Sequence, residues 1–275
     1  MRKSAWTVNQ ILIKAIALIV SAIAIFPLIW MGLAGFKSQE EVLAAPLKFL
    51  PTVWHFENYT MILQDPAFQR AMGTTFIGAL IFMALSLAVN ASAAYVFARL
   101  EFRFKKFWWI YVMTTYFIPA FSITITSFVV VSKLGMLDNL AVLILPGVAS
   151  AYSMFFIRQF YLNVPLALEE AALIDGANRF KIFTSIFLPM SLPPFAIIGI
   201  GAYLGYWNAF VWPVMTMSNE KWFQIGQYIF NFRSGRVAEM HLLMASSFLA
   251  ALPTVILFLI FQRYIVANLK MSGLK

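Results

Sequence analysis

Residues 163–177 read NVPLALEEAALIDGA and lie between two long apolar runs. Pro165 suits the first turn of a helix, where its missing N–H costs no hydrogen bond. Glu169 and Glu170 follow in the N-terminal half of the same segment, where the helix dipole favours acidic side chains. The pattern therefore predicts a helix over about 165–175.

A second short helix is predicted directly after the first. Gly176 suits a left-handed C-cap that ends the first helix. Asn178 can cap a helix that runs toward Ile186, and Pro189 is expected to end it. We therefore expect two short helices that meet at an angle, although a mere connector packed under a helix bundle is the simpler alternative.

The composition of the chain is that of a membrane protein. Of the 275 residues, 62% are hydrophobic and only 11% are charged, and the mean hydropathy is +0.82. A soluble domain has about 25% charged residues, so an ordinary globular enzyme is excluded. A helix needs about 20 apolar residues to cross a bilayer, and six runs of that length lie near 11–35, 72–98, 107–131, 139–160, 188–212 and 242–265. The first run continues through Trp30, which makes it too long for a signal-peptide core.

The distribution of charge predicts the topology. With the N-terminus inside, thirteen of the twenty Lys and Arg residues fall on cytoplasmic segments, whereas the outer segments have no net charge. The net charge of +9 is therefore explained by topology and needs no nucleic-acid partner. The expected fold class is all-α, a polytopic membrane protein with six transmembrane helices and both termini cytoplasmic.

The spans lack the groups that active chemistry would need. No ionisable side chain lies near the middle of a run, although ion-driven transporters usually have one there. The chain has no nucleotide-binding loop, no cysteine and only two histidines, His55 and His241. If the protein moves a solute uphill, another subunit must supply the energy. An intramembrane enzyme would need a catalytic dyad or metal triad at membrane depth, and a structural scaffold is the remaining alternative.

Uncharged polar side chains at membrane depth suggest a path for a solute. Asn90 and Asn208 are costly to leave in hydrocarbon, so each should face a neighbouring helix or an aqueous cavity. Tyr206 and Trp207 precede Asn208, and aromatic rings beside an amide suit a neutral, hydroxyl-rich solute. Hydrogen bonding between helices is the simpler interpretation of both asparagines.

The loop after the fourth run carries a specific motif. Glu170, Ala171, Ala172, Gly176, Ile186, Leu188 and Pro189 match all seven fixed positions of the EAA motif found in permease subunits of ABC importers. The motif also precedes the penultimate run, as in that family. The chain therefore resembles an ABC-importer permease over essentially its whole length.

Further stretches resemble the maltose-type carbohydrate branch of that family. They are Phe56, Asn58 and Tyr59 in the first outer loop, Trp207 and Asn208 followed by residues 210–213, and residues 261–266 in the tail. The acidic residue usual after the Trp and Asn is Ala209 here. This branch implies import of a sugar or oligosaccharide, and the alternative is another solute such as a glycerol phosphodiester, an amino acid or a peptide.

The resemblance also implies partners and residue roles. The expected partners are a second homologous permease, two ABC ATPase subunits that hold ATP and Mg, an extracytoplasmic solute-binding protein and the bilayer of a bacterial plasma (inner) membrane. No cofactor or metal is expected on this chain, which is taken as a single transmembrane domain and not as an enzyme. The cytoplasmic loop 161–187 would dock on an ATPase, with Glu170, Asp175 and Gly176 at the joint. The outer loop 214–240 would meet the binding protein through Trp222, Phe223, Tyr228 and Phe232, or would form an amphipathic segment at the membrane interface.

Overall fold

A computed structural model describes residues 8–235 and 239–272, with side chains for 10–231 and 239–262. These residues contain helices and no strand. They form two compact units, one of residues up to 69 together with 229–253, and the other of residues 70–228 together with those from 254 onward. Each unit is described by itself below.

The first unit is built around the end of a long apolar helix, α1 (Val8–Ala34), which keeps Pro27 inside it. Two short helices follow, α2 (Gln39–Leu43) and α3 (Glu57–Gln64), and the first part of α15 (Met240–Ser272) completes the unit. Asn58 Nδ2 donates to the carbonyl oxygens of Gly35 (2.9 Å) and Lys37 (3.0 Å), which lie just past the end of α1. These bonds satisfy carbonyl groups that a helix end leaves open.

The next residue, Tyr59, makes a similar hydrogen bond about one turn further into α1. Its hydroxyl donates to the Gly32 carbonyl (2.7 Å), and burial raises the pKa of Tyr59 to about 12, so the hydroxyl keeps its proton. A Cβ on Gly35 would lie 2.6 Å from this hydroxyl and 2.9 Å from the Ala245 backbone. Asn58 and Tyr59, two of the residues that carry the family resemblance, therefore hold the first unit together.

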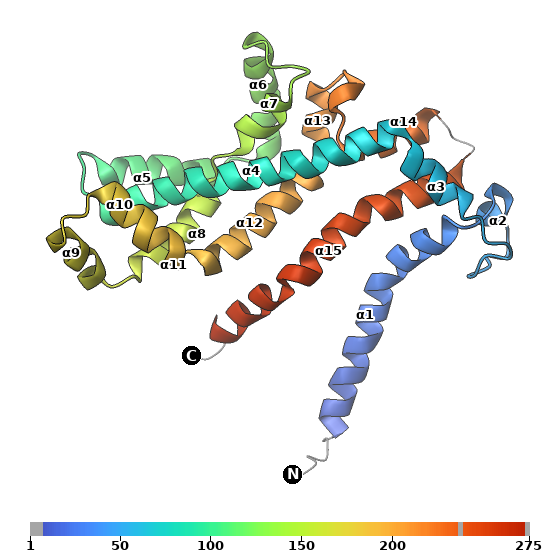
Figure 1. Ribbon diagram of the computed structural model, residues 1–275, viewed down its shortest axis with the longest axis horizontal. Coiled ribbons are helices and arrows are strands. Elements are labelled where there is room, and N and C mark those ends of the chain that lie inside the picture. Colours follow the sequence, from blue (N-terminus) through green and yellow to red (C-terminus); the bar gives the residue numbers. More distant parts are fainter. Residues whose placement is uncertain (1–7, 236–238, 273–275) are drawn as a thin grey trace. The chain divides into compact units, whose positions relative to one another are not determined.

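The second unit contains the remaining helices (Figure 1). Their bounds are α4 (Pro66–Arg99), α5 (Lys105–Thr114), α6 (Ala120–Lys133), α7 (Leu140–Ile144), α8 (Ala151–Leu162), α9 (Leu166–Ile174), α10 (Arg179–Ile182), α11 (Leu188–Met190), α12 (Leu192–Trp207), α13 (Val211–Thr216) and α14 (Ile225–Gly235). Helix α4 begins in the first unit and α14 ends in it. Single 3-10 turns cover 115–117, 145–147 and 220–222, and a π-helical turn covers 183–187.

Three of the six apolar runs are broken rather than continuous helices. Helices α1, α4 and α15 are each long and apolar enough to cross a membrane, and the described residues give up to six spans if each bent pair counts as one. The pairs bend by 104° between α5 and α6, by 48° between α7 and α8, and by 78° between α11 and α12. The predicted runs 107–131, 139–160 and 188–212 therefore correspond to bent helix pairs, each of which gives one span only if the pair is counted as one.

Local chemistry explains these breaks. Ile118 is extended because it precedes Pro119, and Pro119 starts the next helix. The second bend ends at Ser150, which is also extended and caps α8. The third falls at Ser191, and Pro193 and Pro194 lie in the first turn of α12, where proline is tolerated.

Candidate functional site

The 163–189 segment has the predicted local structure. Helix α9 starts after Pro165 and ends at Ile174, and Gly176 follows with φ +80°, in the left-handed region. The Asn178 side chain accepts a hydrogen bond from the Lys181 backbone N–H (2.8 Å) and caps α10. The predicted helix, C-cap and second N-cap are thus confirmed.

The end of the second helix differs from the prediction. Pro189 does not stop it, because the π-helical turn at 183–187 continues into α11, which contains Pro189. A proline cannot donate to the ordinary i−4 carbonyl and its ring clashes there. The wider π turn directly before Pro189 accommodates this.

The motif residues of the loop fall into an exposed and a packed group. Glu170, Ala171, Asp175, Gly176 and Pro189 are exposed. Ala172, Ile186 and Leu188 are half-buried and pack against a core that contains Tyr95, Tyr161 and Phe187. Two apolar side chains also stand out on the exposed surface, Ile174 at 86% and Phe180 at 74% exposure. The exposed face of the loop is therefore both polar and apolar, and its opposite face packs against the core of the second unit.

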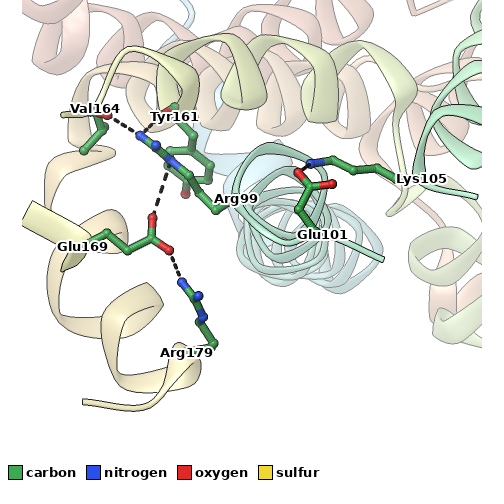
Figure 2. Close-up of polar contacts among 7 residues, drawn as sticks. All are labelled: Arg99, Glu101, Lys105, Tyr161, Val164, Glu169 and Arg179. Carbon is green, nitrogen blue, oxygen red and sulfur yellow. Dashed lines mark hydrogen bonds and ion pairs between the residues drawn. The ribbon is translucent and has the colours of Figure 1, made fainter. Parts of the chain in front are cut away.

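A buried carboxylate ties this loop to the end of α4. Figure 2 shows Glu169 between Arg99, from the last turn of α4, and Arg179, from the first turn of α10. Glu169 Oε1 is paired with Arg179, and Glu169 Oε2 lies 3.9 Å from Arg99 Nε. The Glu169 side chain is only 7% exposed. One carboxylate thus joins three helices.

Arg99 also holds the chain that leads into α9. Its Nη2 donates to the Tyr161 carbonyl (2.6 Å) and to the Val164 carbonyl (Figure 2). These carbonyls belong to the last turn of α8 and the turn after it, where helix ends leave acceptors open. Arg158 adds a bond from its Nε to the Phe97 carbonyl (3.1 Å) on α4.

Sequence reasoning missed Arg99, Glu169 and Arg179. One signal was available, because neighbouring helix residues point about 100° apart. Glu169 and Glu170 therefore point in different directions, which allows one of them to face the protein interior while the other faces solvent. The Arg99 partner could not be read from spacing because it is far from Glu169 in sequence, and Arg179, although only ten residues away, lies across the turn between α9 and α10.

A second feature is a cavity of about 820 Å³ within the second unit. Its lining comes from α4, α6, α7, α8, α12 and α13 and from the break at 146–150 before α8. None of the lining residues is Asp, Glu, Lys, Arg or His. Trp212 carries an indole N–H, which donates to the Val142 carbonyl, and the other polar side chains of the lining carry hydroxyls. They include Ser86, Thr124, Ser127, Ser150, Tyr152, Ser153 and Tyr206. Such a surface can hydrogen-bond a neutral polyol and provides no charge for an ion.

Of the four residues predicted along a solute path, Tyr206 lines this cavity and the other three do not. Asn90 is buried, with its Nδ2 donating to the carbonyls of Ser86 (2.7 Å) and Val148 (2.9 Å) and its Oδ1 accepting from the Ser150 backbone N–H (2.8 Å). Asn90 therefore joins α4 to the break before α8. This agrees with the simpler interpretation, in which it forms hydrogen bonds between helices.

Trp207 and Asn208 lie apart from the cavity lining as well. Trp207 is buried and stacks on Tyr203 at a centroid distance of 5.6 Å. Asn208 is exposed and donates to the Leu204 carbonyl of its own helix (3.0 Å). No group of three or more potential metal ligands is found among the described residues.

The loop after α13 is folded onto the second unit. The Asp138 side chain accepts hydrogen bonds from the Ser218 (2.5 Å) and Asn219 (2.7 Å) backbone N–H groups. Trp222 and Phe223 are half-buried and Tyr228 is buried, so Tyr228 offers no free surface to a partner in this conformation. The side chain of Phe232 lies outside the described residues.

Comparison with known proteins places this architecture in a family. The model of the family described as "Binding-protein-dependent transport system inner membrane component" matches residues 92–271. The chain belongs to this family. It is a multi-pass inner-membrane permease subunit of an ABC transport system and not an enzyme, since the ATPase of such systems is a separate subunit.

Relatives of the permease match it over nearly its full length. The diacetylchitobiose uptake system permease protein NgcG of Streptomyces coelicolor is 30% identical over 92% of this chain and 85% of the relative. The arabinooligosaccharides transport system permease protein AraQ of Halalkalibacterium halodurans is 29% identical over 93% of both chains. The trehalose/maltose transport system permease protein MalG of Thermococcus litoralis is 29% identical over 97% of both.

A solved structure shows the same fold. A chain of a bacterial ABC transporter involved in the import of the acidic polysaccharide alginate superposes with a TM-score of 0.84 at 20% identity. The match covers 95% of this permease and 99% of that chain.

Proposed function

We propose that this permease forms half of the translocation path of an ATP-driven importer for a sugar or oligosaccharide, delivered by an extracytoplasmic binding protein. The observation that carries the proposal is the full-length match to permeases of diacetylchitobiose, arabinooligosaccharide and trehalose/maltose systems. The uncharged cavity supports it, because a mostly apolar lining with several hydroxyl groups suits a neutral polyol.

The α9–α10 loop is the surface on which an ATPase partner would act. Its exposed face carries Glu170, Ala171, Asp175 and Gly176, and its buried face is held by Glu169 and Arg99. A rigid attachment lets movement of a bound ATPase move α4 and α8 with the loop. Two such ATPase subunits would hold ATP and Mg. Binding of the nucleotide and of the binding protein would shift the equilibrium between the inward-open and outward-open states, to the extent that each binds one state more tightly than the other.

The topology, the second permease and the contact with the binding protein are proposed on the same basis. In this proposal each bent pair crosses the membrane once, so residues 1–275 form one transmembrane domain with six spans and both termini cytoplasmic. A second homologous permease supplies the other half of the path. Trp222 and Phe223, which are half-buried, are the accessible part of the expected contact with the binding protein, and Tyr228 on α14 would join it only after a rearrangement exposes it.

An anionic solute is the less favoured alternative. A path for a glycerol phosphodiester or an acidic sugar would need cationic groups, and none of the residues that line the cavity is cationic. A second permease could still supply them. Neutral and acidic ligands can therefore be separated by experiment.

The test is to tag the chain in its native membrane, purify it in mild detergent and identify the accompanying proteins by mass spectrometry. We expect an ABC ATPase, a second permease and a binding protein. The binding protein is then screened against neutral oligosaccharides and matched uronic acid oligosaccharides. Recovery of a lone homo-oligomer would contradict the importer assignment, and selective binding of the acidic ligands would contradict the neutral-sugar assignment alone.

A further inference from the structure

An apolar surface lies in the first unit, on Leu43, the last residue of α2, and on the loop 44–56 that leads to α3. Most of the large side chains of this segment are apolar and exposed, although all of it after Leu43 is a loop rather than a helix. Exposed patches of this kind mark a surface that something apolar covers. The side chains are Leu43, Leu47, Phe49, Leu50, Val53, Trp54 and Phe56, with Leu47 at 64% and Leu50 at 60% exposure.

Some polar groups around this segment are hydrogen-bonded to it and fix its shape, whereas the Lys48 side chain is exposed. Lys37 is fully buried, and its Nζ donates to the Lys48 carbonyl and lies 4.5 Å from the centroid of the Trp30 ring. Glu41 Oε1 accepts from both the backbone N–H (2.7 Å) and the hydroxyl (2.8 Å) of Thr52. The loop therefore has a fixed shape with its apolar side chains outward.

The segment folds back along the last turns of α1. The Phe49 ring stacks on Phe26 (6.0 Å between centroids) and contacts Trp30 (6.2 Å). Since an α-helix rises about 1.5 Å per residue, Trp30 and Phe26 lie about 6 and 12 Å from the end of α1 at Ala34. The Phe49 ring is thus well inside the span Gln10–Ala34 and not beyond its end.

The bilayer depth of this contact follows from the length of α1. A helix of 25 residues is about 37 Å long and a hydrocarbon core is about 30 Å thick, so each end extends past the core by only a few ångströms. The ring of Phe49 then reaches just below the boundary between headgroups and acyl chains. The α1 side chains at 10–27 are themselves all exposed within this chain. The Phe49 ring, stacked on Phe26, joins the segment to that exposed face.

We propose that residues 43–56 form a membrane-interface anchor that binds phospholipid at the Ala34 end of α1. The irregular backbone stays in the hydrated headgroup layer, as lipid requires of unpaired backbone groups. Leucine and aromatic side chains enter the upper acyl region, and Trp54 suits the interfacial position that tryptophan favours. The bilayer is the occupant, and a protein partner on this face is the outcome that the test must separate.

The chain contains no cysteine, so single labels can be placed without removing any residue first. Spin labels are attached to Leu47→Cys and Leu50→Cys in the purified transporter reconstituted in phosphatidylethanolamine and phosphatidylglycerol vesicles. Leu18→Cys, in the middle of α1, is the lipid reference, and Glu57→Cys, at the end of the same loop, is the matched polar control. Accessibility is measured to oxygen, which concentrates in acyl chains, and to a water-soluble nickel complex.

The ratio of oxygen to nickel accessibility is expected to be several-fold higher at Leu47 and Leu50 than at Glu57, and to approach that of Leu18. A ratio equal to that of Glu57 would mean a water-facing loop. Low accessibility to both reagents would mean a covering protein, and either result overturns the proposal.

A second measurement needs no substitution. The unmodified transporter is irradiated with a photoactivatable phospholipid, and cross-linked peptides are mapped by mass spectrometry. We expect cross-links within 43–56 as well as within α1, and labelling of α1 alone would overturn the proposal. Both measurements report lipid contact and not uptake, so they are independent of the transport assignment.

Discussion

Glu169 is a buried carboxylate whose removal leaves Arg99 without a counter-charge in a site that is only 5% exposed. Breaking a buried ion pair from one side costs about 3 kcal/mol, because the remaining charge is neither solvated nor paired. Glu169→Gln should therefore loosen α9 and α10. Hydrogen exchange of the α9 amides should rise by about two orders of magnitude in detergent without any partner.

The neighbouring acid provides the control. Glu170 is exposed and belongs to the surface proposed to meet an ATPase, so Glu170→Gln should leave exchange in α9 unchanged. It should lower uptake only in the assembled transporter. Equal exchange in the two variants would show that the Glu169 pairs do not hold the loop.

Tyr206 and Tyr203 allow a matched test of the proposed sugar path. Both are buried, and neither hydroxyl has a hydrogen-bond partner of normal geometry among the described residues. Only Tyr206 lines the cavity. The Tyr206 hydroxyl is itself buried, so the aromatic ring is the part that can meet a sugar. A ring contact contributes about 1 kcal/mol, so Tyr206→Leu should raise the KM for uptake about fivefold, whereas Tyr203→Leu should not. A similar KM in both variants would remove Tyr206 from the path.

At the scale of elements, the angle between α9 and α10 depends on one glycine. A Cβ on Gly176 would meet nothing within 4 Å, so its φ of +80° is the sole local reason for glycine. Gly176→Ala should destabilise the loop by about 1 kcal/mol through backbone strain alone. Gly176→Val should also abolish uptake and uncouple ATP hydrolysis while membrane insertion persists.

Gly73 is the matched control for this change. It lies inside α4, where a Cβ also meets nothing within 4 Å, and its φ is not positive. Gly73→Ala should be neutral or slightly stabilising. Normal coupled uptake by Gly176→Val would contradict the role of the loop as a rigid lever.

The break before α8 also depends on a single residue, Asn90. Asn90→Ala leaves the Val148 carbonyl and the Ser150 N–H without their partner, and unpaired buried groups cost about 1–3 kcal/mol each. The thermal unfolding midpoint should therefore fall clearly. Asn208→Ala removes one exposed bond within its own helix and should change the midpoint little. Equal shifts in the two variants would refute the bridging role of Asn90.

These elements also show how far sequence reasoning reaches. The bounds and caps of α9 were predictable because Pro165, Gly176 and Asn178 act on their own neighbourhoods. Pro119 lies where α5 and α6 separate, and a proline favours a break there, but the 104° angle depends on packing that no local pattern encodes. The Glu169–Arg99 pair and the Asn90 bridge join residues about 60 or more positions apart, and spacing within a helix cannot reveal such contacts. The π turn before Pro189 was missed because one extra residue in a turn leaves no periodic signal.

At the scale of the whole molecule, the absence of charge from the cavity predicts what drives transport. Proton- or ion-coupled carriers need an ionisable side chain on the path, and none of the residues that line this cavity is acidic, basic or histidine. Uptake into vesicles containing the complete transporter and trapped ATP should therefore continue when a protonophore collapses the proton gradient. Vesicles without ATP are the control and should show no uptake against a gradient. Loss of uptake on adding the protonophore at constant ATP would require a titrating group elsewhere on the path, and the second permease would then be the place to look for it.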